Sequence, residues 1–297
     1  MKHQKFRDKQ VIQMPRRLLL IVLSLSFGVA PLASYGQSYS ARDKTKLARS
    51  SKKNSELQYS LKWSLGRKAQ RGWYLYVPLL QKTLNTESKP NTVEFAGSVM
   101  RWQKARGIFP NGVINSSTLY SFIKFWQSKR LKPIVLARED QLITAPIREF
   151  YDPTRDSALL KVEKETYDSY RRMLKAAIDD PTLKLRADES GRLLPDEKFL
   201  TLVSTYRSPK YQASLRRKQP GASRAQIAFK SPHFTGRALD IYVGGEPVTT
   251  LDFNRGVQVK TPVYRWLVKN AERFGFYNYF YEPWHWEYAP KKEKAAK

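Results

Sequence analysis

Two of the three histidines in this 297-residue chain lie in short motifs that also carry carboxylates. Residues 231–240 read SPHFTGRALD, and residues 282–285 read EPWH. Two imidazoles and a carboxylate can hold a zinc ion with a fourth position left for water, and a carboxylate that is not a ligand can accept the proton of that water. The motifs therefore predict a catalytic zinc site with one Zn²⁺ per chain. The expected ligands are His233, Asp240 and His285, and the expected base is Glu282.

The spacing of the first motif allows both of its side chains to reach one point. Gly236 lies between His233 and Asp240, and glycine permits the positive φ of a tight turn or a close backbone approach. Asp240 stands between two apolar residues, where an ionised carboxylate needs a partner. Taken alone, however, the motif is explained better by a surface histidine and a solvent-facing aspartate.

The second motif makes the metal-site interpretation the stronger one. Glu282 and His285 are three residues apart, which would place them on opposite faces of a regular strand. Because Pro283 disfavours a regular ladder, we expect Glu282 to end a loop and His285 to begin a strand. Both side chains can then face the same cavity. The flanking Trp284 and Trp286 are expected to pack in the core.

A third polar segment, residues 204–212 (STYRSPKYQ), follows a strand-like run. Arg207 on such a loop could grip a carboxylate with two hydrogen bonds or stabilise a developing oxyanion. Gln212 would fall on the first turn of the helix that follows. The alternative is that Arg207 is one of many basic residues, because the chain has a net charge of +28.

The elements around these motifs predict an α+β domain over residues 157–290, with a small, mainly antiparallel sheet and flanking helices. Branched and apolar content favours the strands, and apolar residues at helical spacing favour the helices. The expected strands are 199–205, 238–243 and 284–288, and the expected helices are 159–178 and 262–274.

Residues 71–132 predict a small helical domain that precedes this one. Apolar residues recur at helical spacing in 77–84 and 95–103, and Ser116 or Ser117 can cap a third helix. The other segments are expected to be a polar flexible linker (37–70), a proline-punctuated connection (133–156) and a basic tail (291–297).

The first 36 residues have the pattern of a secretory signal peptide. Basic residues extend to Arg17, an uncharged apolar run covers 18–33, and small residues follow up to Gly36. We expect cleavage after Gly36, which removes His3 and leaves no stable membrane anchor. The alternative is an uncleaved anchor, although the run is shorter than the ~20 apolar residues that a spanning helix needs.

Charge and cysteine content narrow the function classes further. The chain has no cysteine, so any metal must be held by histidines and carboxylates. A net charge of +28 favours anionic partners, which for an exported protein are cell-wall or envelope polymers. Nucleic acid is not expected as a partner, because the chain carries a leader and no nucleic-acid-binding motif.

The helical segment resembles the small three-helix peptidoglycan-binding module of many wall hydrolases. Residues 102–119 read WQKARGIFPNGVINSSTL, which is similar to the module's pattern "FQ…GL..DG..G..T". Trp102 replaces Phe, Asn111 replaces Asp and Asn115 replaces the second Gly, so ligand binding is less supported than the fold. A generic helical bundle is the alternative. A module that only tethers the chain could be removed without loss of peptidase activity.

The three polar motifs together closely resemble the zinc D-alanyl-D-alanine carboxypeptidases and dipeptidases. YRSxxxQ, SxHxxGxAxD and ExWH occur in that order. The family includes the vancomycin-resistance-type enzymes and shares its metal site with lysostaphin-like peptidases and the hedgehog signalling domain. The resemblance covers about residues 160–290 and implies the zinc ligands and base named above. It also implies that Arg207 stabilises the oxyanion or binds substrate, and that Gln212 and Ser231 line the substrate pocket.

The sequence therefore predicts an exported zinc metallopeptidase, in the periplasm or the cell wall, that hydrolyses the terminal D-Ala-D-Ala bond of peptidoglycan stem peptides. An endopeptidase with the same zinc site is an alternative, because loops at 220–230 and 244–256 decide whether the pocket closes beyond the C-terminal residue. A non-catalytic wall-binding protein on the same fold is the alternative from another class. The intact Glu282 argues against it.

Overall fold

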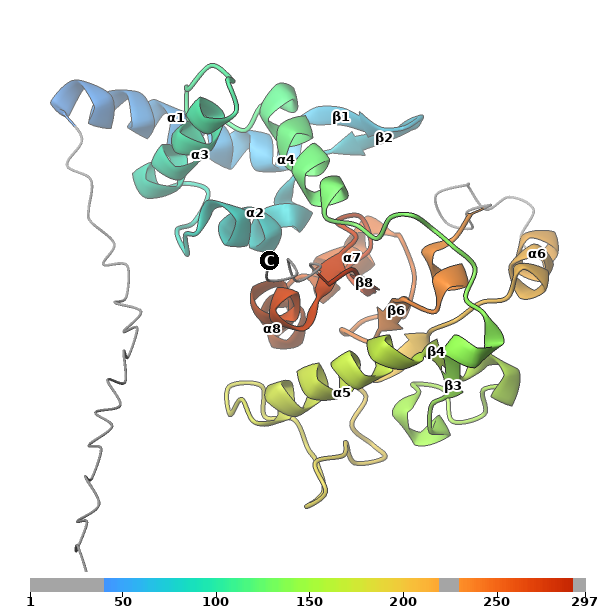
Figure 1. Ribbon diagram of the computed structural model, residues 1–297. Coiled ribbons are helices and arrows are strands. Elements are labelled where there is room, and N and C mark those ends of the chain that lie inside the picture. Colours follow the sequence, from blue (N-terminus) through green and yellow to red (C-terminus); the bar gives the residue numbers. More distant parts are fainter. Residues whose placement is uncertain (1–39, 219–229, 291–297) are drawn as a thin grey trace, which may run out of the picture. The chain divides into compact units, whose positions relative to one another are not determined.

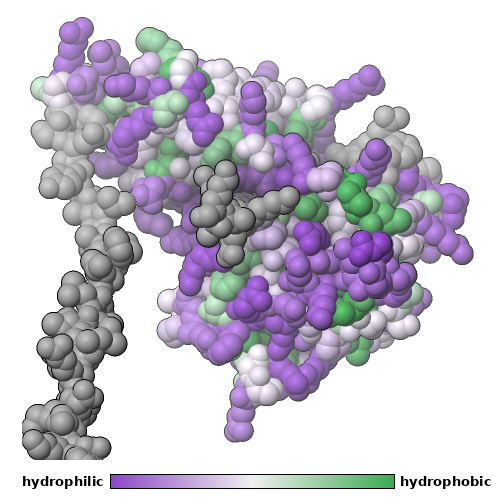
Figure 2. Space-filling model, in the orientation of Figure 1, coloured by the Kyte–Doolittle hydropathy of each residue, from purple (hydrophilic) through white to green (hydrophobic). Residues whose placement is uncertain are grey.

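The computed structural model describes residues 40–218 and 230–290. The predicted leader, the basic tail and most of the 220–230 loop lie outside these residues. These described residues belong to one compact unit, and the face drawn in Figure 2 is mostly hydrophilic. None of the described helices is both long enough and apolar enough to cross a bilayer.

Residues 41–70, within the segment predicted to be a flexible linker, are folded, so that prediction is wrong for them. The segment forms the helix α1 (Ala41–Ser60) and a hairpin of β1 (Lys62–Leu65) and β2 (Lys68–Arg71). The anchor of α1 is polar. The buried side chain of Asn54 donates to the Gly112 carbonyl at 2.8 Å and accepts from the Ile114 amide at 2.8 Å. Polar side chains that anchor a helix in this way do not add to the apolar periodicity of the sequence. The sequence therefore did not predict α1.

The three helices expected within residues 71–132 are present as α2 (Val77–Leu84), α3 (Val93–Ala105) and α4 (Ser116–Ser128). Asn115 rather than a serine caps α4, because its Oδ1 accepts from the Thr118 amide at 3.0 Å. The buried Gln103 fixes the turn before α4. Its Oε1 accepts from the Gly112 amide at 2.8 Å, and its Nε2 donates to the Val113 carbonyl at 3.0 Å.

The remaining chain is α+β with small antiparallel sheets, as predicted (Figure 1). The main sheet has the order β5-β6-β8-β7, and β3 pairs with β4 in a second, two-stranded sheet. Glu163 ends β4 and caps α5 by accepting from the Thr166 amide at 2.8 Å, so α5 begins later than predicted. The strands of the main sheet are β5 (Leu202–Ser204), β6 (Ala238–Ile241), β7 (Phe276–Asn278) and β8 (His285–Tyr288). The two-stranded sheet consists of β3 (Leu142–Thr144) and β4 (Lys161–Glu163). The helices are α5 (Lys164–Ile178), α6 (Pro209–Lys218), α7 (Asp252–Gln258) and α8 (Pro262–Asn270).

The helical segment and the sheet segment share one hydrophobic core. Phe280, in the loop before β8, contacts the ring of Tyr76 with a centroid separation of 5.4 Å and that of Trp126 at 6.0 Å. Aromatic pairs at such separations add about 0.5–1.5 kcal/mol beyond the area they bury. The two segments therefore stabilise each other through direct packing.

We expect Asn54→Ala to lower the free energy of unfolding by about 1–3 kcal/mol, because two buried backbone groups lose their partners. Chemical denaturation followed by circular dichroism measures the change. Ser55→Ala, at the exposed neighbouring position of α1, is the matched control and should stay within about 0.5 kcal/mol of the unmodified chain. Equal stability of the two variants would mean that the hydrogen bonds of Asn54 do not stabilise the fold.

Candidate metal-dependent active site

The sheet register brings Asp240 and His285 together. β6 and β8 are antiparallel neighbours, and Asp240 pairs directly with His285. His233 reaches them from the 3-10 helix η5 (Pro232–Thr235), which Ser231 caps and Gly236 ends with a φ of +66°. One ligand atom from each of these three residues lies within 4.8 Å of the others, and all three residues are buried. The structure therefore groups the three residues predicted to be metal ligands.

His233 is held as a neutral imidazole. Its Nδ1 lies 2.6 Å from the Thr205 carbonyl, which only accepts, so Nδ1 carries the proton and Nε2 keeps its lone pair. Nε2 is 3.3 Å from Asp240 Oδ1. Burial and the positive charge of Arg207 lower the pKa of His233 to about 4. Nε2 is therefore available to a metal ion without the loss of a proton.

His285 is held through both ring nitrogens. Nδ1 is 2.9 Å from Asp240 Oδ1, and Nε2 is 3.1 Å from Glu287 Oε1. Burial acts to lower the pKa of His285, but the hydrogen bonds to Asp240 and Glu287 outweigh it and raise the pKa to about 9. Because Glu287 accepts from Nε2, Nδ1 is the nitrogen left to bind a metal ion once its proton departs.

Asp240 carries a buried negative charge. Burial opposes its ionisation, but the interactions with His233 and Arg207 outweigh this and hold the pKa of Asp240 well below its usual value. Arg207 Nη2 donates to Asp240 Oδ2 at 2.6 Å, and its Nε donates to Ser204 Oγ at 2.9 Å. Arg207 thus grips a carboxylate of the protein itself. Its Nη1 has no hydrogen-bond partner among the described residues.

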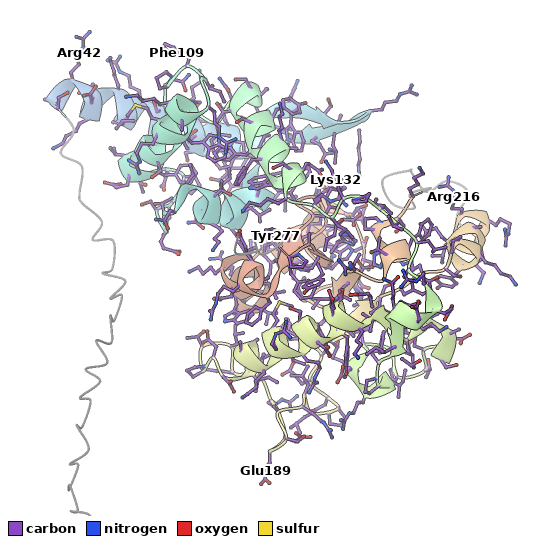
Figure 3. The ribbon with its side chains drawn as sticks, viewed as in Figure 1. Arg42, Phe109, Lys132, Glu189, Arg216 and Tyr277 are labelled. Atoms are coloured by element: carbon purple, nitrogen blue, oxygen red, sulfur yellow. The ribbon has the colours of Figure 1, made fainter. Side chains whose placement is uncertain are left out.

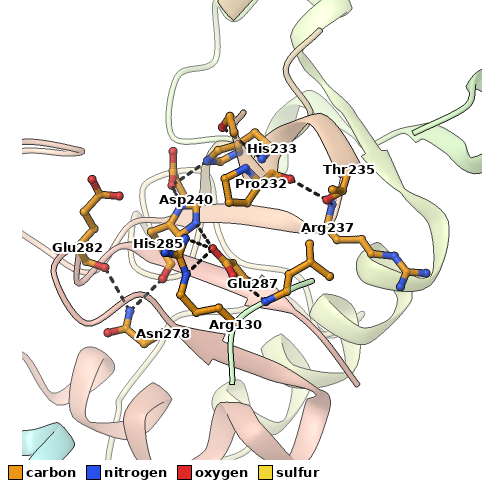
Figure 4. Close-up of polar contacts among 12 residues, drawn as sticks. Arg130, Pro232, His233, Thr235, Arg237, Asp240, Asn278, Glu282, His285 and Glu287 are labelled. Atoms are coloured by element: carbon orange, nitrogen blue, oxygen red, sulfur yellow. Dashed lines mark hydrogen bonds and ion pairs between the residues drawn. The ribbon is translucent and has the colours of Figure 1, made fainter. Parts of the chain in front are cut away.

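Glu282 lies in the same cavity, which has a volume of about 670 Å³ (Figure 4). As expected, it ends a loop and His285 begins β8. The loop is closed by the His285 amide, which donates to the Glu282 carbonyl at 3.0 Å, and by Asn278 Nδ2, which donates to the same oxygen at 3.2 Å. Burial raises the pKa of the Glu282 carboxyl to about 7, a value suited to a general base at neutral pH.

Gln212 and Ser231 both line the cavity and are buried. Gln212 lies on α6, whose first residue is Pro209. Ser231 has a structural role, because its Oγ accepts from the His233 amide at 3.3 Å and so starts the turn that carries His233. Both tryptophans are buried as expected, and Trp284 also lines the cavity.

Two residues of the site, Glu287 and Arg130, were not predicted from the sequence. Glu287 is fully buried beneath His285 and receives hydrogen bonds from Arg130 Nε at 2.9 Å and from the Leu131 amide at 2.9 Å. Burial opposes its ionisation, but His285 and Arg130 lower the pKa of Glu287 to about 2. Alternation along a strand could have indicated Glu287, because residues two apart share a face. No local signal points to Arg130.

Residues 160–291 match the family model described as VanY: D-alanyl-D-alanine carboxypeptidase. This segment is a VanY-type domain. The match confirms the predicted family resemblance and indicates peptidase activity of the D-Ala-D-Ala carboxypeptidase type on peptidoglycan. The three candidate ligands, Glu282 and Arg207 lie inside the VanY-type domain, whereas Arg130 lies outside it. No curated protein matches the chain.

We expect binding of Zn²⁺ at pH 7 to release about one proton from His285, because its pKa of about 9 keeps it protonated in the metal-free protein. Proton and metal compete for Nδ1, so affinity should fall about tenfold for each pH unit below 9. Calorimetry in buffers of different ionisation enthalpy counts the proton. The Glu282→Gln variant removes the second group that titrates near neutral pH. Zinc binding without proton release in that variant would contradict the proposed role of Nδ1.

Proposed function

We propose that this chain is an exported zinc carboxypeptidase that removes the terminal D-alanine from peptidoglycan stem peptides. The observation that carries the proposal is the buried group of His233, Asp240 and His285 in one cavity with the Glu282 carboxylate. A VanY-type domain over residues 160–291 agrees with this reaction.

The donor set fits zinc. Two imidazole nitrogens and one carboxylate oxygen are the ligands of many catalytic zinc sites, and the chain offers no thiolate. Glu287 and the Thr205 carbonyl fix the second ring nitrogens of the two histidines, as is usual around metal-ligating histidines. A bound zinc ion would supply Lewis acidity, which polarises a carbonyl and makes water more acidic.

Glu282 then moves the protons. Its carboxylate accepts one proton from the attacking water and becomes a neutral carboxylic acid, a form that burial favours. The same oxygen returns the proton to the nitrogen of the departing D-alanine, so the peptide C–N bond breaks with the charges balanced. Arg207 keeps Asp240 ionised and oriented while this happens.

The cavity also offers a partner for the C-terminal carboxylate of a substrate. Arg155 lines it and is partly buried, with Nε donating to the Leu159 carbonyl at 3.2 Å. No carboxylate among the described residues forms an ion pair with Arg155. Lys132 and Lys230 line the same cavity. An unpaired guanidinium in a cavity suits a ligand carboxylate, which supports a carboxypeptidase over an endopeptidase.

The remaining chain is consistent with a location at the cell wall. The leader-like pattern of the first 36 residues supports export, and the net charge of +28 suits anionic wall or envelope polymers. The likeness of residues 102–119 to a peptidoglycan-binding module supports contact with peptidoglycan through the helical segment.

Glu282→Gln should leave zinc stoichiometry unchanged and lower turnover by about 10²- to 10⁴-fold, because the amide cannot accept the proton of water. The assay follows alanine release by mass spectrometry on a pentapeptide that ends in D-Ala-D-Ala, with bound zinc measured in parallel. Turnover within threefold of the unmodified enzyme would rule out Glu282 as the base. Cleavage at another bond would assign the enzyme to the endopeptidases.

Arg155→Met should lower kcat/KM about 10- to 100-fold for a peptide with a free C-terminal carboxylate, because a charged hydrogen bond is lost. The same peptide with an amidated C-terminus should be cleaved poorly by both enzymes and at similar rates. Arg148→Met, an exposed arginine in the same connection, is the control and should match the unmodified enzyme. Equal losses on both peptides would show that Arg155 does not bind the carboxylate.

A further inference from the structure

We propose that Arg130, at the end of the helical segment, is a positioning residue for the metal site of the VanY-type domain. It acts through Glu287, which holds His285 (Figure 4). The helical segment would then complete the active site in addition to any role in wall binding. The inference rests on the proposed metal site but does not depend on which peptide bond is cut.

The contacts form a continuous chain from α4 to the candidate metal ligand. Arg130 approaches Glu287 Oε1 with both Nε, at 2.9 Å, and Nη2. The same Oε1 lies 3.1 Å from His285 Nε2, and the Leu131 amide donates to Glu287 Oε2 at 2.9 Å. Both oxygens of a fully buried carboxylate are therefore occupied, and two of the three donor residues precede the VanY-type domain in sequence.

Arg130 is itself held in place. Its Nη1 donates to Gln127 Oε1 at 3.2 Å, one turn earlier, and its guanidinium lies 4.1 Å from the ring centre of Tyr279. Gln127, Arg130 and Tyr279 all line the cavity. An arginine fixed by these two contacts presents its donors to Glu287 with little loss of conformational entropy, which favours a rigid acceptor for His285.

The connection that follows Arg130 also contacts the motif that carries His233. It begins near Lys132, labelled in Figure 3, and the Ala137 amide donates to the Phe234 carbonyl at 2.8 Å. Phe234 lies in η5 beside His233. Residues 130–137 therefore contact the elements that carry both histidines. This arrangement argues against the expectation that residues 37–132 could be removed without loss of peptidase activity.

The energetic reason is the buried charge of Glu287. A carboxylate removed from water needs a charged or multiply hydrogen-bonded partner, and loss of one partner of such a pair is costly. Without Arg130, Glu287 Oε1 would lose the donors that fix its position, and it would no longer hold the Nε2 proton of His285 in a fixed direction. Loss of partners around metal-ligating histidines lowers metal affinity by about 10- to 100-fold.

The test compares Arg130→Met with Lys129→Met in the full chain by competition for Zn²⁺ with a chromophoric chelator. Lys129 is the adjacent residue, and it forms an ion pair with Glu272 at 3.2 Å, away from the metal site. We expect Arg130→Met to bind Zn²⁺ about 10- to 100-fold more weakly and Lys129→Met to stay within twofold. Arg130→Lys, which keeps the charge, should recover part of the affinity.

Two further readouts separate positioning from a general loss of stability. Glu287→Gln combined with Arg130→Met should bind Zn²⁺ no more weakly than Glu287→Gln alone, because Arg130 acts through that carboxylate. The activity of Arg130→Met should also recover as Zn²⁺ is raised above its weakened Kd, with KM unchanged. Additive losses in the double variant, or no recovery with Zn²⁺, would overturn the proposal.

A folded Arg130→Met protein with the Zn²⁺ affinity of the unmodified chain would overturn the inference and leave the proposed function standing. Absence of Zn²⁺ binding by the unmodified chain would overturn both. If Arg130→Met does not fold, Arg130→Gln takes its place, because it keeps a donor for Glu287 while losing the charge. The same affinity limits then decide the outcome.

Discussion

Asp240 carries a negative charge at a position that is only 2% exposed to solvent. A lone carboxylate there would be protonated or would unfold the site, and the surrounding residues meet that constraint. Two imidazoles face its Oδ1, and Arg207 binds its Oδ2. The pairing of β6 with β8, the turn that carries His233 and the loop that carries Arg207 all converge on this carboxylate.

Glu287 is a second buried carboxylate that needs charged and hydrogen-bonded partners. It lies two residues after His285 on β8 and is fully buried, with Arg130 and the Leu131 amide as partners. The site is thus built in two layers, in which Asp240 gathers the candidate ligands and Glu287 orients one of them. Because the second layer takes its cation from Arg130, two residues after the end of α4, the helical segment and the VanY-type domain are electrostatically coupled as well as packed together. Phe280, between Tyr76 and Trp126, provides the apolar part of that junction.

The errors in the sequence predictions have specific physical causes. The sequence predicted a linker in place of α1 because three of the four side chains on its buried face, Ser50, Ser51 and Asn54, are polar. The helical spacing of that face therefore gives almost no apolar signal. The cap of α4 was predicted one or two residues late because Asn115 and the two serines after it are all good capping residues, and only the backbone geometry selects among them. The α+β class and the strands β5, β6 and β8 were predictable, since their apolar runs are local and continuous, whereas the sequence did not predict β7 (Phe276–Asn278).

The sequence by itself determined the chemistry of the candidate site. Few side-chain types can bind a metal ion or move a proton, and here they stand in short motifs whose glycine and proline restrict the local backbone. Tertiary structure decided which groups surround them. Arg130 meets Glu287 across 157 positions of the chain, and Arg207 meets Asp240 across 33. Such partners depend on strand register and on the packing of α4 against the sheet segment. Neither the register nor this packing can be predicted from the local sequence.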